Sequence, residues 1–569
     1  MRAFSKVVIG AALALGVAAK SVEYYWDIAY LEANPDGQLA RRVIGVNGGW
    51  PPPTLHATLN DTLTIEVRNS LDVGVTLHAH GLLQNDTSYM DGADGVTQCS
   101  IPPGSNFTYA YRISQTGSYW AHAHTNLMYA DGLRAPLVLH NPEEPHAYDE
   151  DVVVTFEDWY HQEGAELIEE YYSWKNPGGA EPVPKSALVR IDGDGEGVWR
   201  VRANTTYRLR LINMSALSSF HFAIEGHDLQ VIEVDGVDTH AYTVTNVLLA
   251  AAQRVSVLVS TRNTTSFNYV YRVDLDTDLY DAVPDDLVFN LTGVVQYAND
   301  APVKREDTEW YAFPDIELTP VDAMPALGFD VSYDMEIEFG QYTDARNHGA
   351  FNNITYMKPS LPALMTALTA KDPFDPLAYG RQTNTRVIEY MKEVQLVVRN
   401  SDSGSHPIHM HTAQFQIIAR GTLPYNETQG LQPSPAPMRR DTIMIAAGEF
   451  AVLRFRADNL GVLFVHCHIV TLHQYTGLAA QFIVGPDVMQ QTMRVPKAIY
   501  DQCQQQGIAV SGAAREQDGP VLYPAGWTAR AKGALAGCIL AALFGFATIL
   551  WYGWSSAKYQ PVPEAVAEN

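Results

Sequence analysis

The sequence predicts an all-β protein of three β-sandwich domains, preceded by a cleaved leader and followed by one membrane-spanning helix. Two observations predict the sandwiches. Charged residues make up only 18% of the chain, whereas Gly, Pro and aromatic residues are frequent, a composition typical of β-rich globular domains. A two-strand pattern also recurs three times at domain-sized intervals, and 569 residues are enough for three or four domains.

The recurring pattern is an alternating strand, an Asn, a polar loop and a second strand rich in His or Phe. It appears in residues 63–81, 206–236 and 393–418. Alternation of apolar and polar residues is typical of strands with one buried face. Repetition at this spacing indicates homologous sandwiches. We expect the three domains at 20–145, 146–300 and 301–504.

The two ends of the chain carry apolar segments with different signatures. Residues 1–19 combine Arg2 and Lys6 with an apolar run and small residues, which predicts a signal peptide cut after Ala19. Residues 533–554 carry no charge and would span about 33 Å as a helix, enough for a hydrocarbon core. We therefore expect a stalk at 505–532, a transmembrane helix at 533–554 and a cytosolic tail at 555–569.

Charge and modification signals favour a secreted domain held at a membrane. The net charge of −26 argues against nucleic acid as a partner and favours a cationic substrate or a metal ion. A leader with a single span predicts a cell-membrane protein with an extracellular domain, and a vacuolar-type membrane satisfies the same signals. N-x-S/T sequons, which fit this location, occur at Asn60, Asn85, Asn106, Asn204, Asn213, Asn263, Asn290, Asn353 and Asn426.

The chain has four cysteines, and three of them have simple interpretations. Cys538 lies in the predicted span, and Cys99 and Cys503 are free to pair in an oxidising compartment. The fourth, Cys467, stands between two histidines.

Histidines are concentrated in four clusters that hold ten of the eighteen. Residues i and i+2 of a strand point to the same face, so a His-x-His motif places two imidazoles side by side. One such pair is usually a satisfied core or surface pair, but four clusters favour a metal centre. Imidazole suits Cu, Zn, Fe and Ni, and a His₂Cys set favours type 1 copper. The clusters are His78-x-His80, His122-x-His124, His406-x-x-His409-x-His411, and His466-Cys467-His468 with His473 beyond.

Four segments resemble the copper motifs of the multicopper oxidases, a family of cupredoxin β-sandwiches. They are "LHAHGLLQ", "GSYWAHAHTNLMYADGLRAPLVL", "HPIHMHTAQFQ" and "FVHCHIVTLHQYTGL", in the family's order, with "PMRRDT" at 437–442 in addition. The resemblance extends over nearly the whole region between leader and span. It implies three cupredoxin-like domains and four coppers per chain: one type 1, one type 2 and two type 3.

The resemblance also implies a role for each clustered residue. His406 and Cys467 match type 1 ligands, and His78 and His409 match type 2 ligands. Asp91 matches an acidic position near the cluster. The family often links the positions of Cys99 and Cys503 by a disulfide. The residues that match type 3 ligands are His80, His122, His124, His411, His466 and His468.

The type 1 motif departs from the family pattern at its second histidine. The family places that ligand five residues after the cysteine, where this chain has Leu472, and His473 follows one position later. Leu478 keeps the usual interval from that histidine to the axial position. A one-residue insertion within Val470–Leu472 keeps His473 as a ligand, and the alternative is a damaged site. Val470 also replaces a carboxylate of the iron-oxidising relatives.

The chain is similar to the membrane-anchored fungal ferroxidases. Glu181, Asp286 and Asp402 match their iron-site carboxylates, and Tyr356 matches a position linked to efficient iron turnover. The similarity implies Fe(II) and O₂ as substrates, a role in iron uptake and a membrane iron permease as partner. Two alternatives stay open: a laccase-like oxidase of phenols or pigment precursors, and a non-catalytic copper-binding or permease scaffold with a degraded type 1 site.

Overall fold

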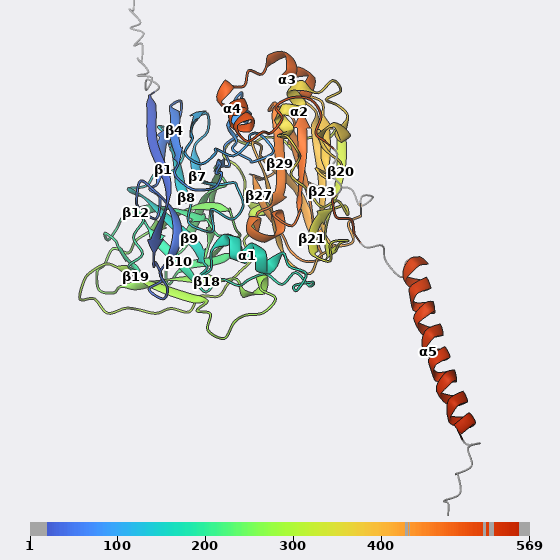
Figure 1. Cartoon of the computed structure of the whole chain (residues 1–569). Coiled ribbons are helices and arrows are strands. Elements are labelled where there is room, and N and C mark those ends of the chain that lie inside the picture. Colours follow the sequence, from blue (N-terminus) through green and yellow to red (C-terminus); the bar gives the residue numbers. More distant parts are fainter. Residues whose placement is uncertain (1–19, 427–430, 432, 516–518, 523–528, 557–569) are drawn as a thin grey trace, which may run out of the picture. The chain divides into compact units, whose positions relative to one another are not determined.

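The computed structural model describes residues 20–426, 431, 433–515, 519–522 and 529–556 (Figure 1). One compact unit ends at Val521, and a second holds the helix α5 (Ala529–Ser556). The expected leader and nearly all of the expected tail lie outside the described residues. Strands dominate the first unit, which confirms the all-β fold class.

The first sandwich, blue in Figure 1, consists of two four-stranded sheets. Their orders are β2-β1-β4-β6 and β3-β8-β7-β5. The strands are β1 (Ser21–Ala33), β2 (Arg41–Val46), β3 (Leu55–Thr58), β4 (Thr62–Asn69), β5 (Leu77–His80), β6 (Asn106–Arg112), β7 (Gly117–Ala123) and β8 (Arg134–His140).

The second sandwich pairs a six-stranded sheet, β10-β9-β12-β17-β14-β15, with a five-stranded sheet, β11-β19-β18-β13-β16. Helix α1 (Gly164–Tyr171) interrupts it after β9. The strands are β9 (Glu150–Trp159), β10 (Ser186–Ile191), β11 (Val198–Arg200), β12 (Thr206–Asn213), β13 (Phe220–Ile224), β14 (Leu229–Val234), β15 (Val237–Val244), β16 (Val247–Leu249), β17 (Arg254–Ser260), β18 (Tyr269–Leu275) and β19 (Asn290–Gln296).

The third sandwich again pairs six strands, β21-β20-β23-β28-β25-β26, with five, β22-β30-β29-β24-β27. The strands are β20 (Val331–Gln341), β21 (Asn347–Phe351), β22 (Thr385–Ile388), β23 (Glu393–Asn400), β24 (His406–Met410), β25 (Phe415–Thr422), β26 (Arg439–Arg440), β27 (Thr442–Ile445), β28 (Glu449–Arg456), β29 (Gly461–Cys467) and β30 (Ala479–Val484). The short helices are α2 (Ala363–Thr369), α3 (Pro486–Thr492) and α4 (Lys497–Gln505).

The three sandwiches repeat one topology. Each described sheet has one parallel strand pair, and its other pairs are antiparallel. The parallel pairs are β1–β4 and β3–β8, β9–β12 and β11–β19, and β20–β23 and β22–β30. This shared arrangement gives the repeat seen in the sequence a structural basis.

A buried asparagine closes the same loop in each sandwich. Asn69, Asn213 and Asn400 end the equivalent strands β4, β12 and β23. Each side-chain amide donates to two backbone carbonyls, one in the loop that directly follows and one further along the chain, at 2.7–3.1 Å. Such donors satisfy carbonyls that the turn would otherwise bury unpaired. Asn213 is therefore a structural residue, and its sequon, unlike the eight exposed ones, is buried.

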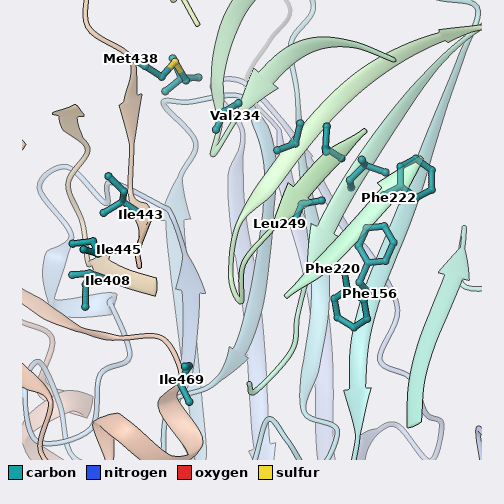
Figure 2. Close-up of a cluster of buried hydrophobic side chains, with 14 of the residues drawn as sticks. Phe156, Phe220, Phe222, Val234, Leu249, Ile408, Met438, Ile443, Ile445 and Ile469 are labelled. Carbon is teal, nitrogen blue, oxygen red and sulfur yellow. The ribbon is translucent and has the colours of Figure 1, made fainter. Parts of the chain in front are cut away.

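The cores are formed by the inward faces of these strands. In the second sandwich Phe156, Phe220 and Phe222 lie together, and in the third Ile408 and Ile443 pack between the sheets (Figure 2). All five side chains are buried. Burial of a side chain of this size contributes about 1.5–3 kcal/mol, so these faces fix the strand register around the histidine motifs.

The C-terminal part of the first compact unit stays attached to the sandwiches. A disulfide joins Cys99 to Cys503 in α4, as the family resemblance implied. Beyond it, the Gly512 amide donates to Thr369 Oγ1 at 2.8 Å, and the Arg515 amide donates to Ser360 Oγ at 2.7 Å. Within the described residues of the segment expected as a stalk, Gly512 and Arg515 are thus hydrogen-bonded to the third sandwich.

Helix α5 is the one described helix that is long and apolar enough to cross a membrane. An 18-residue window within Ala529–Ser555 has a mean hydropathy of 2.2. The helix starts four residues before the predicted span, because a helix continues into polar flanks that hydropathy alone does not count.

Candidate metal centres

Three predicted ligands meet at one buried point of the third sandwich. His406 begins β24, Cys467 ends β29, and His473 lies in the turn η6 (Val470–Gln474). Cys467 Sγ is 3.7 Å from His406 Nδ1 and 3.5 Å from His473 Nδ1, and the two Nδ1 atoms are 3.2 Å apart. All three side chains are buried. One thiol and two imidazoles at these distances provide the donor set that type 1 copper prefers.

The extra residue of this motif is taken up in a π-helical turn. The Leu478 amide donates to the His473 carbonyl, five residues back, at 2.8 Å, and η6 is π-helical over Val470–Gln474. A π-turn absorbs one additional residue without disrupting its flanks. The turn brings His473 beside Cys467, one position beyond the family's usual spacing. The side chain of Val470 lies outside the described residues.

The thiol and the imidazoles of this site shift each other's pKa values toward the charged forms. Burial disfavours an imidazolium at His473, but the hydrogen bonds and charges of Cys467 and Glu181 outweigh it and raise the pKa of His473 to about 10. Burial also disfavours a thiolate, yet His406 and His473 lower the pKa of Cys467 to about 7. A thiolate beside two imidazoles can exchange their protons for a metal cation.

Two carboxylates hold the outer nitrogens of the two imidazoles. Glu181 Oε1 lies 2.7 Å from His473 Nε2, and Asp402 Oδ2 lies 3.1 Å from His406 Nε2. Their side chains are 18% and 22% exposed, whereas the imidazoles are buried. These contacts fix the rings with Nδ1 toward the thiol. They also connect the buried site to the surface.

A third acidic group beside the site was not singled out in the sequence. Partial burial, followed by repulsion from Glu181 and Asp402, raises the pKa of Asp281. The Asp281 carboxylate therefore lies within electrostatic range of both. Asp286, the expected third carboxylate, is exposed five residues further along the same acidic segment. The motif alone could not choose between two acids so close in sequence.

Tyr356 lies close to His466, one of eight histidines that form a second cluster, described next. Its ring packs against Phe464, with 5.2 Å between centroids, and the Phe464 ring lies 5.0 Å from that of His466. Burial raises the pKa of Tyr356. The structure therefore connects Tyr356 to the cluster through one aromatic ring.

Eight histidines of the first and third sandwiches form a second candidate metal centre, the histidine cluster. They come from β5, β7, β24 and β29 and the residues that directly follow them. All eight are buried. Within each of three groups, two of which share His80, the possible ligand atoms lie within 4.8 Å of one another. These groups are His80, His122 and His468; His124, His411 and His466; and His78, His80 and His409.

Ring orientation shows that this cluster fits metal ions. Four of the histidines direct Nδ1 at a backbone carbonyl, at 2.7–2.9 Å. Several buried ring nitrogens have no partner among the described residues, which is costly unless a metal ion occupies the space. His80 is reversed: Nε2 contacts Asp441 and Thr442, and Nδ1 is unpaired. The unpaired Nε2 atoms belong to His78, His122, His124, His409 and His468.

Five of the cluster histidines are held neutral. Burial first, and then repulsion between neighbouring imidazoles, keeps the pKa values of His122, His124, His411, His466 and His468 well below the usual value. Neutral imidazole is the form that binds a metal ion. The site therefore needs little proton release when it is loaded.

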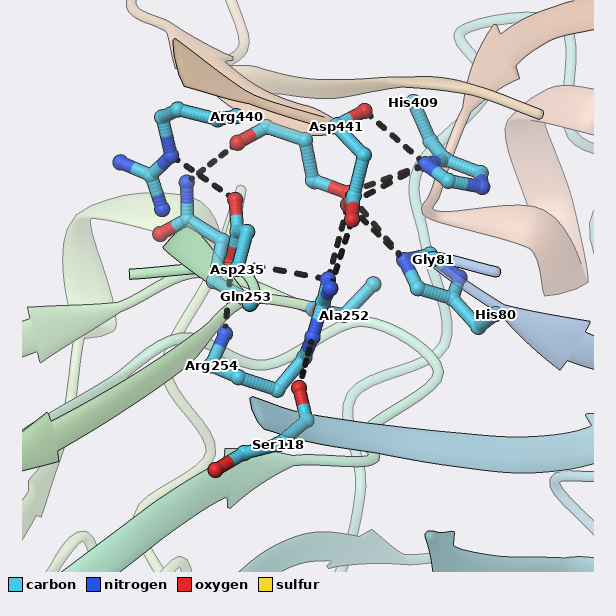
Figure 3. Close-up of polar contacts among 12 residues, drawn as sticks. His80, Gly81, Ser118, Asp235, Ala252, Gln253, Arg254, His409, Arg440 and Asp441 are labelled. Atoms are coloured by element: carbon cyan, nitrogen blue, oxygen red, sulfur yellow. Dashed lines mark hydrogen bonds and ion pairs between the residues drawn. The ribbon is translucent and has the colours of Figure 1, made fainter. Parts of the chain in front are cut away.

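Two buried aspartates orient the cluster from outside. Asp91 Oδ2 accepts a hydrogen bond from His411 Nδ1 at 2.8 Å, so Asp91 lies beside the cluster. Asp441 contacts His80 through Oδ1 at 3.3 Å, and its carbonyl accepts from His409 Nδ1 at 2.9 Å (Figure 3). Such contacts fix the tautomer and direction of each ring.

Asp441 is itself held by an arginine of the second sandwich. Arg254 donates to its two carboxylate oxygens at 2.8 and 2.6 Å (Figure 3). Against burial, Arg254 holds the pKa of Asp441 well below its usual range. Sequence reasoning noted the segment "PMRRDT" but missed this pair, because its members are 187 residues apart.

One tripeptide joins the two centres. Successive residues of a strand face opposite sides. Cys467 therefore faces the His₂Cys site, whereas His466 and His468 belong to two different groups of the cluster. A short covalent path therefore runs from the Cys467 thiol to each of these two histidines.

Three repeated β-sandwiches with a His₂Cys site, linked by one tripeptide to a cluster of eight histidines, define the class of oxidases that bind several copper ions. The chain belongs to the multicopper oxidase family, whose domain signatures match residues 27–144, 150–299 and 356–488.

Similar proteins cover nearly the whole chain. It is 40% identical to the iron multicopper oxidase fer1 of Mycosarcoma maydis, over 96% of this chain and 95% of that protein. It is 39% identical to the iron transport multicopper oxidase FET3 of Gibberella zeae, over 95% and 90%.

Solved structures agree with this assignment. Fet3p, described as a multicopper oxidase that functions in iron import, is similar with a TM-score of 0.85 and 30% identity, over 89% of this chain and 100% of that one. A laccase from Botrytis aclada is similar with a TM-score of 0.74 and 28% identity, over 86% and 92%. The cupredoxin-like fold and the enzyme class predicted from the sequence are confirmed.

Proposed function

We propose that the protein is a ferroxidase, which oxidises Fe(II) to Fe(III) beside the His₂Cys site and reduces O₂ to water at the histidine cluster. One observation carries the proposal: Glu181 and Asp402, both partly exposed, hydrogen-bond the two imidazoles of that site. Hard oxygen ligands favour Fe(III) over Fe(II), so they make iron a better electron donor. The names of the two iron oxidases above support the same substrate.

Copper suits both donor sets, with a proposed total of four ions per chain. His406, Cys467 and His473 would hold type 1 copper, and His78 with His409 would hold type 2 copper. The type 3 pair would be held by His80, His122, His124, His411, His466 and His468. Bound copper supplies a one-electron acceptor at the first site and the O₂-reducing centre at the second.

The chain's own residues connect iron to that chemistry. Glu181 places an iron-binding carboxylate one hydrogen bond, 2.7 Å long, from His473. Leu478, which matches the family's axial position, is buried and offers no sulfur, and this would favour a high potential for copper held at the first site. Asp91 and Asp441 keep the cluster imidazoles oriented.

We also propose a single-pass protein of the cell membrane with its oxidase domain outside and an iron permease as partner. The apolar helix α5 and the iron-transport relatives support this placement. The net charge of −26 favours attraction of Fe(II). A vacuolar-type membrane is the alternative, and fluorescence microscopy of the tagged full-length chain separates the two.

The geometry argues against one of the two alternative functions and leaves the other open. The non-catalytic scaffold depended on a type 1 site disrupted by the displaced histidine, and His473 lies beside Cys467 after all. The phenol oxidase has the laccase similarity in its favour. It predicts that organic substrates do not depend on the site's carboxylates.

The test compares iron and phenol oxidation in carboxylate variants. Glu181→Ala combined with Asp402→Ala should lower kcat/KM for Fe(II) by about 10²-fold, roughly 2.7 kcal/mol of transition-state stabilisation, and leave the blue colour and phenol oxidation largely intact. Equal loss for both substrates, or undiminished Fe(II) oxidation, would remove the proposal.

Paired single variants address the third carboxylate. Asp286→Ala is expected from the sequence motif to weaken Fe(II) binding, and Asp281→Ala is expected to do so from its electrostatic contact with Glu181 and Asp402. KM for Fe(II), measured side by side with unchanged phenol kinetics as the control, identifies the residue that binds iron.

A further inference from the structure

A buried histidine outside both metal centres contacts the backbone just after His473. His348, in β21, is only 4% exposed. Its Nδ1 lies 3.0 Å from the Thr476 carbonyl oxygen and 3.2 Å from Thr355 Oγ1. Since a carbonyl only accepts, Nδ1 carries a proton and donates it to Thr476.

The Thr476 carbonyl lies at a critical place in the π-turn. It falls between His473 and Leu478, whose own backbone hydrogen bond closes the turn. Thr355 Oγ1 donates to the same carbonyl at 2.8 Å. The next residue, Gly477, has φ +112°, and a Cβ there would lie 1.9 Å from Thr355 Oγ1. The backbone is thus packed closely against Thr355, which follows β21, and the Thr476 carbonyl is held by two donors, His348 and Thr355.

The other face of the His348 ring reaches the second sandwich. Nε2 lies 3.0 Å from Asp344 Oδ2 and 3.0 Å from Tyr172 Oη. Tyr172 follows α1 in the segment that leads to Glu181, and the Arg346 guanidinium lies 4.6 Å from its ring centroid. One imidazole therefore contacts both segments that meet at the His473–Glu181 hydrogen bond.

The turn that carries Asp344 is also held by the C-terminal segment of the ectodomain. The Thr343 amide donates to the Val521 carbonyl at 3.0 Å. Removal of the chain beyond the third sandwich would release this contact, so the variants belong in the full-length chain.

We propose that His348 is a positioning residue for the type 1 centre. Through Thr476 it fixes the backbone between His473 and Leu478, and through Tyr172 it fixes the segment that carries Glu181. It touches neither metal nor substrate. The spectroscopic part of this inference is independent of the ferroxidase proposal, whereas the effect on Fe(II) rests on it.

The test uses full-length, copper-loaded protein and three substitutions. His348→Leu removes both contacts. His348→Asn places an amide N–H where Nδ1 was and loses the contacts of Nε2. His227→Leu is the matched control, because His227 is buried in the second sandwich with the same kind of partners, the Glu225 carbonyl and the Tyr297 hydroxyl.

His348→Leu should keep its copper, shift the type 1 absorption band and reduction potential, and raise KM for Fe(II) about five- to tenfold, the effect of about one hydrogen bond. His348→Asn should restore the band and potential but keep the raised KM. His227→Leu should change stability alone.

An unchanged spectrum, potential and KM in His348→Leu would overturn the proposal, as would equal spectral shifts in the control. If His348→Leu does not fold, Tyr172→Phe provides the second test, because it removes one hydroxyl. It should raise KM for Fe(II) with the type 1 band unchanged, and an unaltered KM would contradict the proposed link to Glu181. If His348→Leu shifts the type 1 band but the wild type does not oxidise Fe(II), the positioning role stands and the ferroxidase proposal fails.

Discussion

Replacing Arg254 with Met tests whether the second sandwich supports the histidine cluster. Arg254 is fully buried between Asp441 and Asp235, and donates to the Ser118 carbonyl at 3.0 Å. Methionine fills similar space but carries no charge. The substitution leaves the Asp441 carboxylate buried without its guanidinium partner, beside His80 and His409.

The expected cost follows from that stranded charge. Removal of one partner of a buried ion pair destabilises a protein by about 3–5 kcal/mol. Asp235 keeps Arg440 at 2.9 Å (Figure 3), so most of the loss arises at Asp441. Second-sphere contacts to metal-bound histidines are worth about 10–100-fold in metal affinity, and we expect Arg254→Met to lose copper within that range.

Chemical denaturation of the copper-free protein measures the first effect, and copper content after dialysis against a chelator measures the second. Adding Asp441→Asn removes the stranded charge. The double variant should regain much of the stability of Arg254→Met but not its copper affinity. A loss below about 1 kcal/mol in Arg254→Met, or a double variant no more stable than the single one, would refute the reasoning.

Three further predictions concern stability and the type 1 ligand. Burial disfavours an ionised Glu233, but Arg208 and Arg210 outweigh it and lower its pKa from 4.5 to about 2. Its ionised form should therefore stabilise the fold by roughly 3 kcal/mol above pH 4.5, and this stabilisation should be lost as the pH falls toward 2. The acid unfolding curve of Glu233→Gln should lack this pH-dependent component. An acid unfolding curve identical to that of the wild type would contradict the prediction. Cys99→Ser should cost about 2–5 kcal/mol in denaturation, with Cys503→Ser giving no additional loss; additive losses would argue against the bond. His473→Ala should abolish the blue band and all oxidase activity, whereas Leu472→Ala should remain blue despite a core cost of about 2–5 kcal/mol; a blue His473→Ala would refute the insertion.

The grouping of the candidate metal ligands could be predicted from the sequence because their spacing is local in the chain. The spacing of two in His78-x-His80 and in His466-x-His468 fixes which imidazoles share a strand face, whatever the rest of the fold does. The displaced His473 was also interpretable as an insertion. Its π-helical form was not, because that form depends on donors such as the Thr355 hydroxyl, more than a hundred residues away.

Contacts between distant segments were beyond the sequence. The Arg254–Asp441 pair and the His348–Tyr172 contact each join residues more than 170 positions apart. Burial was equally invisible: the sequon at Asn213 has the required letters, but the amide closes a loop inside the sandwich. The segment expected as a stalk has the composition of a linker, and its attachment depends on side chains of the third sandwich.

The most direct test of the central claim is the stoichiometry of oxygen uptake during Fe(II) oxidation by the purified, copper-loaded wild-type chain. Reduction of O₂ to water takes up four electrons, so oxygen-electrode traces with measured Fe(II) additions should give four irons oxidised per O₂, with saturable kinetics and a higher kcat/KM than for any phenol tested. Two irons per O₂ with peroxide as product, non-saturable iron oxidation, or a clear preference for a phenol would contradict the account.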